Sequence, residues 1–221
     1  MKQDILNKAG EGRRFVRTSR HAATPERNVF AVLRDLMPRR ALTVAESDAL
    51  AELQATHLLG LAGVRGPSTP NELLTELPRL QVVEEPDLPS SASALWVSGR
   101  WLVLINGAEP ATRRRFSLAH EVKHCLDHPR RGLLYQDRPG LSADVQAERA
   151  ADVFAAALLM PKLWIRRRWT AGEQTISGLA ETFQVSPEAM ARRLETLGLR
   201  DRPRDRHGAR GNADPLLEGS R

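Results

Sequence analysis

The segment 113–128, with the sequence RRRFSLAHEVKHCLDH, contains three of the chain's six histidines within nine positions. His120 and His124 are four residues apart, so their imidazoles meet only if the segment is helical, because positions four apart share one helix face. Glu121 is rotated from His120 by about 100°, which takes it away from a shared ion but keeps it near a water molecule beside that ion. The H-E-x-x-H pattern therefore predicts a helix with two zinc ligands, His120 and His124, and a general base, Glu121.

The third histidine of this segment is a poor candidate for the same ion. A catalytic zinc usually has three protein ligands and a fourth position open to water. Along a straight helix His128 lies about 12 Å from His120, at ~1.5 Å per residue, which is far beyond the reach of a zinc–nitrogen bond of about 2 Å. The third ligand must therefore come from another segment. His128, and Tyr135 just after the helix, are candidates for a group that stabilises an oxyanion.

The next helical pattern, over residues 143–160, supplies a suitable ligand. It carries Glu148 and, four residues later on the same face, Asp152. A carboxylate ligand together with a second carboxylate fits a site of two histidines and one glutamate, in which the second acid orients a ligating imidazole. We therefore expect Glu148 to complete the metal site and Asp152 to orient a histidine, with Asp144 as the alternative for the second role.

The remaining patterns predict an α+β fold. LQVVEEP, ALWVS and WLVLIN have the composition of strands, and the last two are joined through Ser98-Gly99-Arg100 as a hairpin, which favours a small antiparallel sheet. Trp96 and Trp101 are interpreted as packing on this sheet rather than as a binding surface. The longest of the earlier helical patterns, 43–64, has Thr43 or Ser47 as its cap.

The C-terminal stretch QTISGLAETFQVSPEAMARRLETLGL contains two short helical patterns separated by Val185-Ser186-Pro187, with Ser186 placed to cap the second. It resembles a helix-turn-helix. The residues expected to form its core are Leu179, Ala180, Val185, Met190 and Leu194.

Composition limits the cellular setting. The single cysteine, Cys125, excludes an internal disulfide and is typical of a reducing compartment, and no apolar run is long enough to span a membrane, so we expect a cytoplasmic protein. Cys125 points around the motif helix, away from the metal ligands, as a small core residue. The net charge of +6 is concentrated near the two ends, where a solvated tail is favoured over nucleic-acid binding.

These patterns divide the chain into four parts. Residues 1–27 are predicted to be a disordered basic N-terminus and 201–221 a disordered tail. Between them we expect a domain that carries the zinc site at 28–170, which the resemblance given next implies to be a zinc metallopeptidase domain, and helix-turn-helix-like helices at 171–200.

RRRFSLAHEVKHCLDH followed by ERAADVFAAALLMP resembles the ImmA/IrrE family of metallo-endopeptidases, whose pattern is R-F-[ST]-x-A-H-E-x-x-H and then E-x-x-A-[ND]-x-F-A-x-x-L-L-M-P. The similarity covers roughly residues 43–200. It implies a mainly helical, zincin-like core of the gluzincin type that uses Zn²⁺. By this resemblance His120, His124 and Glu148 are the zinc ligands, Glu121 is the catalytic acid and base, and Asp152 occupies a position that is Asn or Asp in relatives.

The resemblance also implies a partner. Members of the family are cytoplasmic regulators, often associated with phages or mobile elements, that cleave a helix-turn-helix repressor encoded beside them. In relatives the C-terminal helices commonly pack as part of the peptidase fold. The alternative for this chain is a transcription-related DNA- or protein-binding module with a structural metal site, in which Arg192 and Arg193 would contact DNA. The intact Glu121 favours the peptidase, since a structural site needs no base.

One residue departs from the family pattern. Relatives usually have glycine at the position of Lys123. On the helical wheel Lys123 flanks the ligand face, so it either lines the cleft and disfavours basic substrate segments or extends its amine to solvent, and the second interpretation is favoured.

Overall fold

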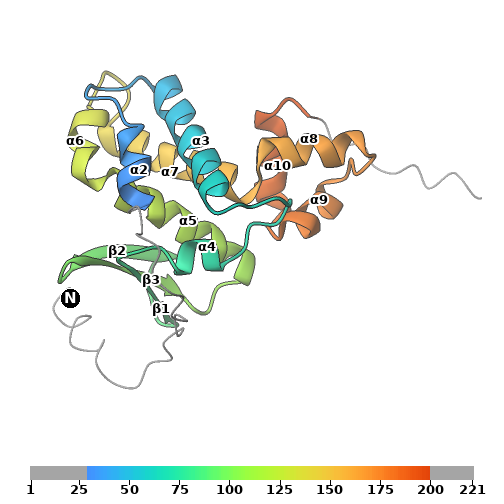
Figure 1. Ribbon diagram of the computed structural model, residues 1–221, viewed down its shortest axis with the longest axis horizontal. Helices are drawn as coiled ribbons and strands as arrows, with labels where there is room; N and C mark the ends of the chain where they lie inside the picture. Colours follow the sequence, from blue (N-terminus) through green and yellow to red (C-terminus); the bar gives the residue numbers. More distant parts are fainter. Residues whose placement is uncertain (1–28, 200–221) are drawn as a thin grey trace, which may run out of the picture.

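The computed structural model describes residues 29–199 (Figure 1). The predicted disordered segments, 1–27 and 201–221, lie outside the described residues. The elements follow in the order α2 (Val29–Asp35), α3 (Val44–Leu61), α4 (Glu72–Thr75), β1 (Leu80–Glu85), β2 (Ala92–Val97), β3 (Arg100–Asn106), α5 (Ala111–Asp127), the 3-10 turn η1 (His128–Arg130), α6 (Arg131–Leu134), α7 (Ala143–Leu159), α8 (Lys162–Thr170), α9 (Ile176–Phe183) and α10 (Pro187–Thr196). The predicted α+β class is confirmed. Within these residues, no helix combines the length and the apolar character that crossing a bilayer requires.

The helix boundaries follow from capping side chains in the sequence. Thr43 caps α3 in a capping box with Glu46, in which each side chain binds the backbone N–H of the other residue. Ser142 caps α7 through the N–H of Val145, and Ser186 caps α10 as predicted, through the N–H of Ala189.

The sheet has the strand order β1-β3-β2 and is mixed rather than antiparallel throughout. β2 and β3 form the predicted hairpin, whose two-residue turn has positive φ at both Ser98 and Gly99, as a type I′ turn requires. β1 pairs with β3 in parallel, which corrects the expectation of a purely antiparallel sheet. The reason is that β3 lies between the other two strands: the chain leaves β1, runs through β2 at the far edge and turns back into β3, which therefore has the direction of β1.

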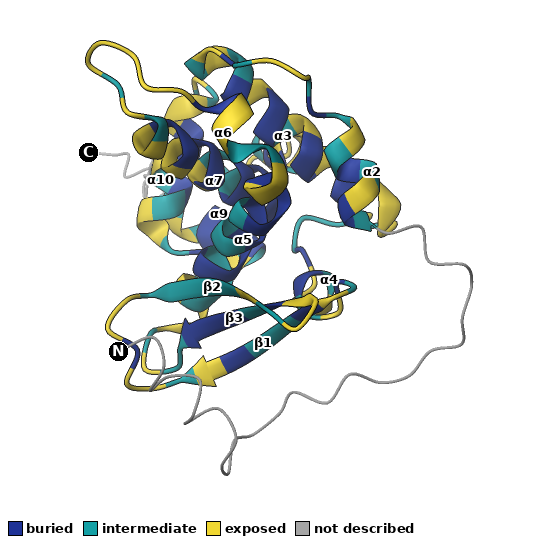
Figure 2. Ribbon diagram, turned by 90° about the vertical axis from the view of Figure 1, so that its left-hand side faces the viewer, coloured by how far each residue is buried: buried dark blue, intermediate teal, exposed yellow. Residues whose placement is uncertain are grey.

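Helix α5 lies between the sheet and α7, and α7 in turn packs on α3 (Figures 1 and 2). Alternate residues of β3 face two sides: Trp101, Val103 and Ile105 enter the main core, and Leu104 enters a small second cluster with Val83. Helix α5 is therefore fixed on both sides, with Ala119 and Cys125 fully buried. The interpretation of Cys125 as a core residue is confirmed, and burial raises the pKa of its thiol.

The C-terminal helices α8, α9 and α10 gather at one end of the molecule (Figure 1). Their interior residues belong to the main hydrophobic core, including all five that were expected from the helix-turn-helix pattern: Leu179, Ala180, Val185, Met190 and Leu194. The Arg193 side chain is 3% exposed, donates to the Met160 carbonyl and pairs with Glu52 of α3 at 2.7 Å. These contacts attach α10 to the body of the protein, while the division at residue 170 stays a prediction.

Candidate metal centre

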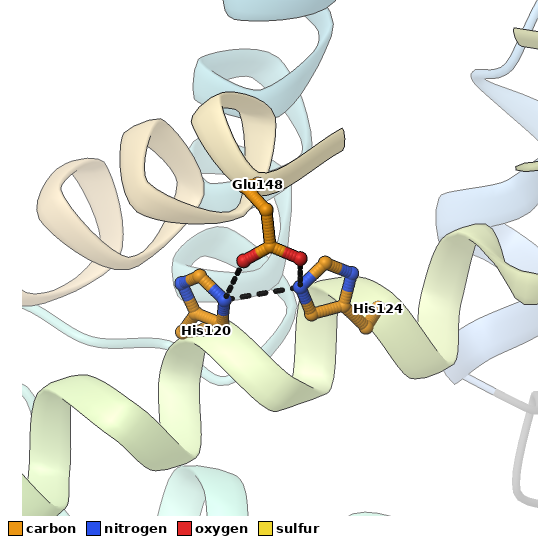
Figure 3. Close-up of side chains that lie close together, drawn as sticks. All are labelled: His120, His124 and Glu148. Atoms are coloured by element: carbon orange, nitrogen blue, oxygen red, sulfur yellow. Dashed lines mark hydrogen bonds and ion pairs between the residues drawn. The ribbon is translucent and has the colours of Figure 1, made fainter. Parts of the chain in front are cut away.

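Three side chains from two helices converge on one point (Figure 3). His120 and His124 extend from α5 and Glu148 from α7, and one ligand atom of each lies within 4.8 Å of the other two. The two imidazole Nε2 atoms are 3.0 Å apart. The Glu148 carboxylate spans both rings, with one oxygen 3.1 Å from His120 Nε2 and the other 3.3 Å from His124 Nε2.

These separations and this donor set fit a metal ion. Ligand atoms about 2.0–2.1 Å from a tetrahedral zinc ion are about 3.3 Å from one another, close to the spacing of the three groups. Two imidazoles and a carboxylate are donors that zinc accepts readily. His120, His124 and Glu148 therefore form a group that could bind a metal ion, and they are the three residues that sequence reasoning placed together.

Asp152 lies behind His120, one turn along α7 from Glu148. Its Oδ1 is 2.9 Å from His120 Nδ1, so a proton on Nδ1 is donated to the carboxylate and the Nε2 lone pair faces Glu148 and His124. Burial lowers the pKa of His120, but the hydrogen bond to Asp152 and the charges of Asp152, Glu148 and Glu121 outweigh it, so the pKa is raised. The alternative orienting acid, Asp144, instead pairs with Arg131 at 2.7 Å.

Glu121 lines the same cavity as the three ligand residues. This cavity has a volume of about 340 Å³ and lies between β2, α5 and α7. Burial raises its pKa above the ordinary value for a carboxyl group, and the charge of Glu148 raises it further. The charge of His120 and a hydrogen bond with the backbone of Ala94 act in the opposite direction. Glu121 is thus beside the ligand cluster but outside it, as the helical spacing predicts.

The two residues predicted to stabilise an oxyanion, His128 and Tyr135, lie in different surroundings. His128 is exposed and lines the cavity together with Glu121 and His124. Tyr135 is 2% exposed, and its hydroxyl donates to the Asp127 carboxylate inside the protein. Tyr135 is absent from the cavity lining, so the expectation that it assists at the site is corrected.

Lys123 contradicts both interpretations offered for it. Its side chain neither lines the cleft nor reaches solvent: it is 0% exposed, and its ammonium lies 2.6 and 2.7 Å from the two carboxylate oxygens of Asp127. Burial lowers the pKa of Lys123, and the charge and hydrogen bond of Asp127 offset this only in part, so the pKa stays below its ordinary value. The Tyr135 hydroxyl completes this buried cluster at 3.5 Å from the ammonium. Sequence reasoning missed the cluster, although a lysine and an aspartate four residues apart on a helix were its visible signal.

Comparison with known proteins identifies the family. The profile of the IrrE N-terminal-like domain, peptidase M78, matches residues 80–195, which is slightly more than half of the chain and includes both α5 and α7. The chain belongs to this family. The resemblance seen in the sequence is thereby confirmed, and membership of the M78 family supports a metallopeptidase-type role.

A solved structure shows the same fold over most of the molecule. A Mycobacterium tuberculosis transcriptional regulator superposes with a TM-score of 0.52 at 21% identity, over 80% of this chain and 54% of its own. The present chain therefore spans about half the length of that protein. No curated protein matches the sequence.

Proposed function

We propose that this protein is a zinc-dependent endopeptidase, in which His120, His124 and Glu148 hold Zn²⁺ and Glu121 is the general acid and base. The observation that carries the proposal is that Glu121 shares one cavity with three converging ligand atoms. A site that only stabilised the fold would have its fourth position closed and would need no carboxylate beside it.

The proposed chemistry uses the side chains in distinct roles. A bound zinc ion would polarise the scissile carbonyl and make water more acidic. Glu121 accepts the proton of the attacking water and passes it to the leaving amine, and its raised pKa suits a group that must both accept and donate. In this proposal Asp152 fixes the orientation of His120, and the exposed imidazole of His128, which lines the same cavity, donates to the developing oxyanion.

The substrate we propose is a protein segment in extended form. β2 is an edge strand, since it pairs only with β3 within the described residues, and Ala92, Ser93 and Ala94 line the cavity. An edge strand can bind an extended chain through backbone hydrogen bonds and thereby lay a peptide bond beside Glu121. A helix-turn-helix repressor cleaved in the cytoplasm is the specific substrate that the family resemblance favours.

The alternative, a DNA- or protein-binding module with a structural metal, has one feature in its favour. The structurally similar protein from M. tuberculosis is described as a transcriptional regulator. Against DNA reading by α10, Arg193 is buried in its ion pair with Glu52 and is not available to a phosphate or base. Only Arg192 of the two candidate arginines is exposed.

The decisive experiment compares the wild type with Glu121→Gln during co-expression with a candidate helix-turn-helix partner. Loss of the general base is expected to slow cleavage by roughly 10²–10⁴-fold while bound zinc, measured by elemental analysis, is unchanged. The matched control is Glu181→Gln, the same change at an exposed carboxylate on α9. Equal cleavage by Glu121→Gln and wild type, with zinc retained, would overturn the peptidase proposal.

A further inference from the structure

A second cavity lies directly beside the candidate metal centre. It has a volume of about 260 Å³ and is bounded by α2, β2, β3 and the turn after α5. Trp101 and His128 line both this cavity and the one that contains Glu121. The volume is just below the ~300 Å³ at which pockets for whole small molecules begin, which suits one large side chain of a longer ligand.

The wall of this second cavity is aromatic. The ring centroids of Trp96 and Trp101 are 5.2 Å apart, and those of Trp101 and His128 are 5.0 Å apart, both edge to face. Trp101 is 7% exposed and belongs to the core, as predicted, whereas Trp96 is 52% exposed. The interpretation of Trp96 as sheet packing therefore accounts for only part of its surface. The remainder of the indole is apolar area that an apolar ligand group would remove from water.

The rim of the cavity is positively charged. Two arginines line it, and they differ in how they are paired. Arg34 donates to the backbone carbonyls of Leu126 and Cys125 at 3.0 and 2.9 Å, so its guanidinium is committed to the end of α5. Arg79 is exposed, and its side chain has no hydrogen bond or ion pair among residues 29–199. A carboxylate that approached the cavity would therefore find a free guanidinium at Arg79.

From these features we infer that the second cavity is a specificity pocket for the substrate, which holds one aromatic or large aliphatic side chain while an adjacent acidic residue pairs with Arg79. The inference rests on the proposed peptidase function. Ala94 and Trp96 are two positions apart on β2 and project to the same face, so a chain laid along this edge passes both Glu121 and the pocket. Along β2 the residues that line the two cavities, Ala94 and Trp96, are thus one strand repeat, about 7 Å, apart.

The test uses the full chain loaded with zinc and a synthetic peptide library with every residue type at each position. Mass spectrometry of the products is expected to show Phe, Trp or Leu at one position near the cut and Asp or Glu beside it. Trp96→Ala is expected to lower kcat/KM for peptides with the aromatic residue by about 10-fold and to leave their alanine counterparts nearly unchanged, since full burial of one large apolar side chain contributes roughly 10–150-fold and the variant removes one wall of the pocket. Arg79→Glu is expected to replace the acidic preference with a basic one.

Matched controls and a second measurement keep the outcomes separate. Arg65→Glu makes the same charge change at an exposed arginine outside both cavities and is expected to leave the profile unchanged. Independently, zinc-loaded Glu121→Gln is titrated with acetyl-Phe-Asp-amide, acetyl-Asp-Phe-amide and acetyl-Ala-Ala-amide while the Trp96 indole N–H signal is followed by NMR. A shift with the first two probes only is expected.

Two failures would be distinguishable. If the library is cut but Trp96→Ala and Arg79→Glu leave the profile of cleaved peptides unchanged, the pocket is wrong and the peptidase proposal stands. If the wild type cuts neither the library nor the co-expressed helix-turn-helix protein while the Phe-containing probes still shift the Trp96 signal, the peptidase proposal is wrong and the cavity remains a binding pocket for an aromatic side chain.

Discussion

Helix α5 carries two polar clusters on adjoining faces, and they differ in almost every physical respect. The first, His120, His124 and Glu148, faces a cavity. The second, Lys123, Asp127 and Tyr135, is enclosed in the protein. The Glu148 side chain is 59% exposed, whereas those of Lys123 and Asp127 are 0% and 4% exposed. Only the first cluster is accessible to an ion, a substrate or water.

The charge balance of the two clusters differs as well. In the buried cluster one ammonium is matched by one carboxylate, and the tyrosine hydroxyl is neutral. Around the two imidazoles, by contrast, stand the three carboxyl groups of Glu121, Glu148 and Asp152, and this negative surplus raises the pKa of His120. A closed cluster is thus satisfied by its own members, while an open one with surplus negative charge is suited to receive a cation.

The largest effect that would test this contrast is expected for Lys123→Met. Removing the ammonium leaves the Asp127 carboxylate buried with Tyr135 as the one donor that remains within residues 29–199, and breaking a buried ion pair in this way costs about 3–5 kcal/mol. The free energy of unfolding, measured by urea titration, should fall by that amount. Zinc binding by the folded variant should persist, because no ligand is removed.

Two controls define what that result means. Lys123→Met with Asp127→Leu removes both charges and should recover much of the lost stability, since no uncompensated charge stays buried. Arg149→Ala breaks a pair with Asp48 that is largely exposed on the arginine side and should cost only about 0–1 kcal/mol. A loss of less than 1 kcal/mol for Lys123→Met would show that the buried cluster is not closed as described.

A smaller loss is expected for Tyr135→Phe. The phenol donates to Asp127, and a hydrogen bond to a charged group contributes about 1.5–3 kcal/mol. The ion pair with Lys123 survives in this variant, so the loss should stay below that of Lys123→Met in the same urea titration. Cleavage activity per folded molecule should be unchanged, and a selective loss of activity would restore Tyr135 as a candidate at the site.

The contrast also explains how much could be predicted from the sequence. The open cluster depends on local helical geometry: residues four apart share a face, so the relative placement of His120 and His124, and of Glu148 and Asp152, follows once both segments are helices. The boundaries of the second helix are also predicted closely, at 143–160 against the observed Ala143–Leu159. Local periodicity and capping are encoded in neighbouring residues.

Burial, in contrast, depends on elements distant in the chain. The surroundings of Lys123 are decided by how Tyr135 packs after α6, and no spacing rule reveals that contact. The parallel pairing of β1 with β3 has the same cause. A parallel pair needs a long crossover, and here residues 86–99, which include β2 itself, provide it. The roles of the ligand residues stay predictions until a metal is measured.

Asp152→Ala would test the open cluster. Loss of the carboxylate frees the His120 ring to rotate, and removal of such an orienting group typically weakens metal binding by about 10–100-fold. Zinc affinity is measured by competition with a chromophoric chelator. Asp152→Asn should retain part of the effect because its carbonyl still accepts the Nδ1 proton, and Asp144→Asn, whose carboxylate pairs with Arg131, should change nothing.

The smallest effect is expected when the open cluster is altered in metal-free protein. His120→Ala removes a partly exposed ring whose polar contacts are to Asp152, Glu148 and His124, so without zinc the free energy of unfolding should change by about 1 kcal/mol or less, the typical size of a single-substitution effect. The contiguous core does not depend on this ring, and a chelator should leave the helical circular dichroism of the wild type intact. With zinc at about 100 times its Kd the wild type should gain about 2.7 kcal/mol and His120→Ala much less. Unfolding by the chelator alone would instead make the metal structural, which would remove the distinction between the open and the closed cluster and favour the binding-module alternative.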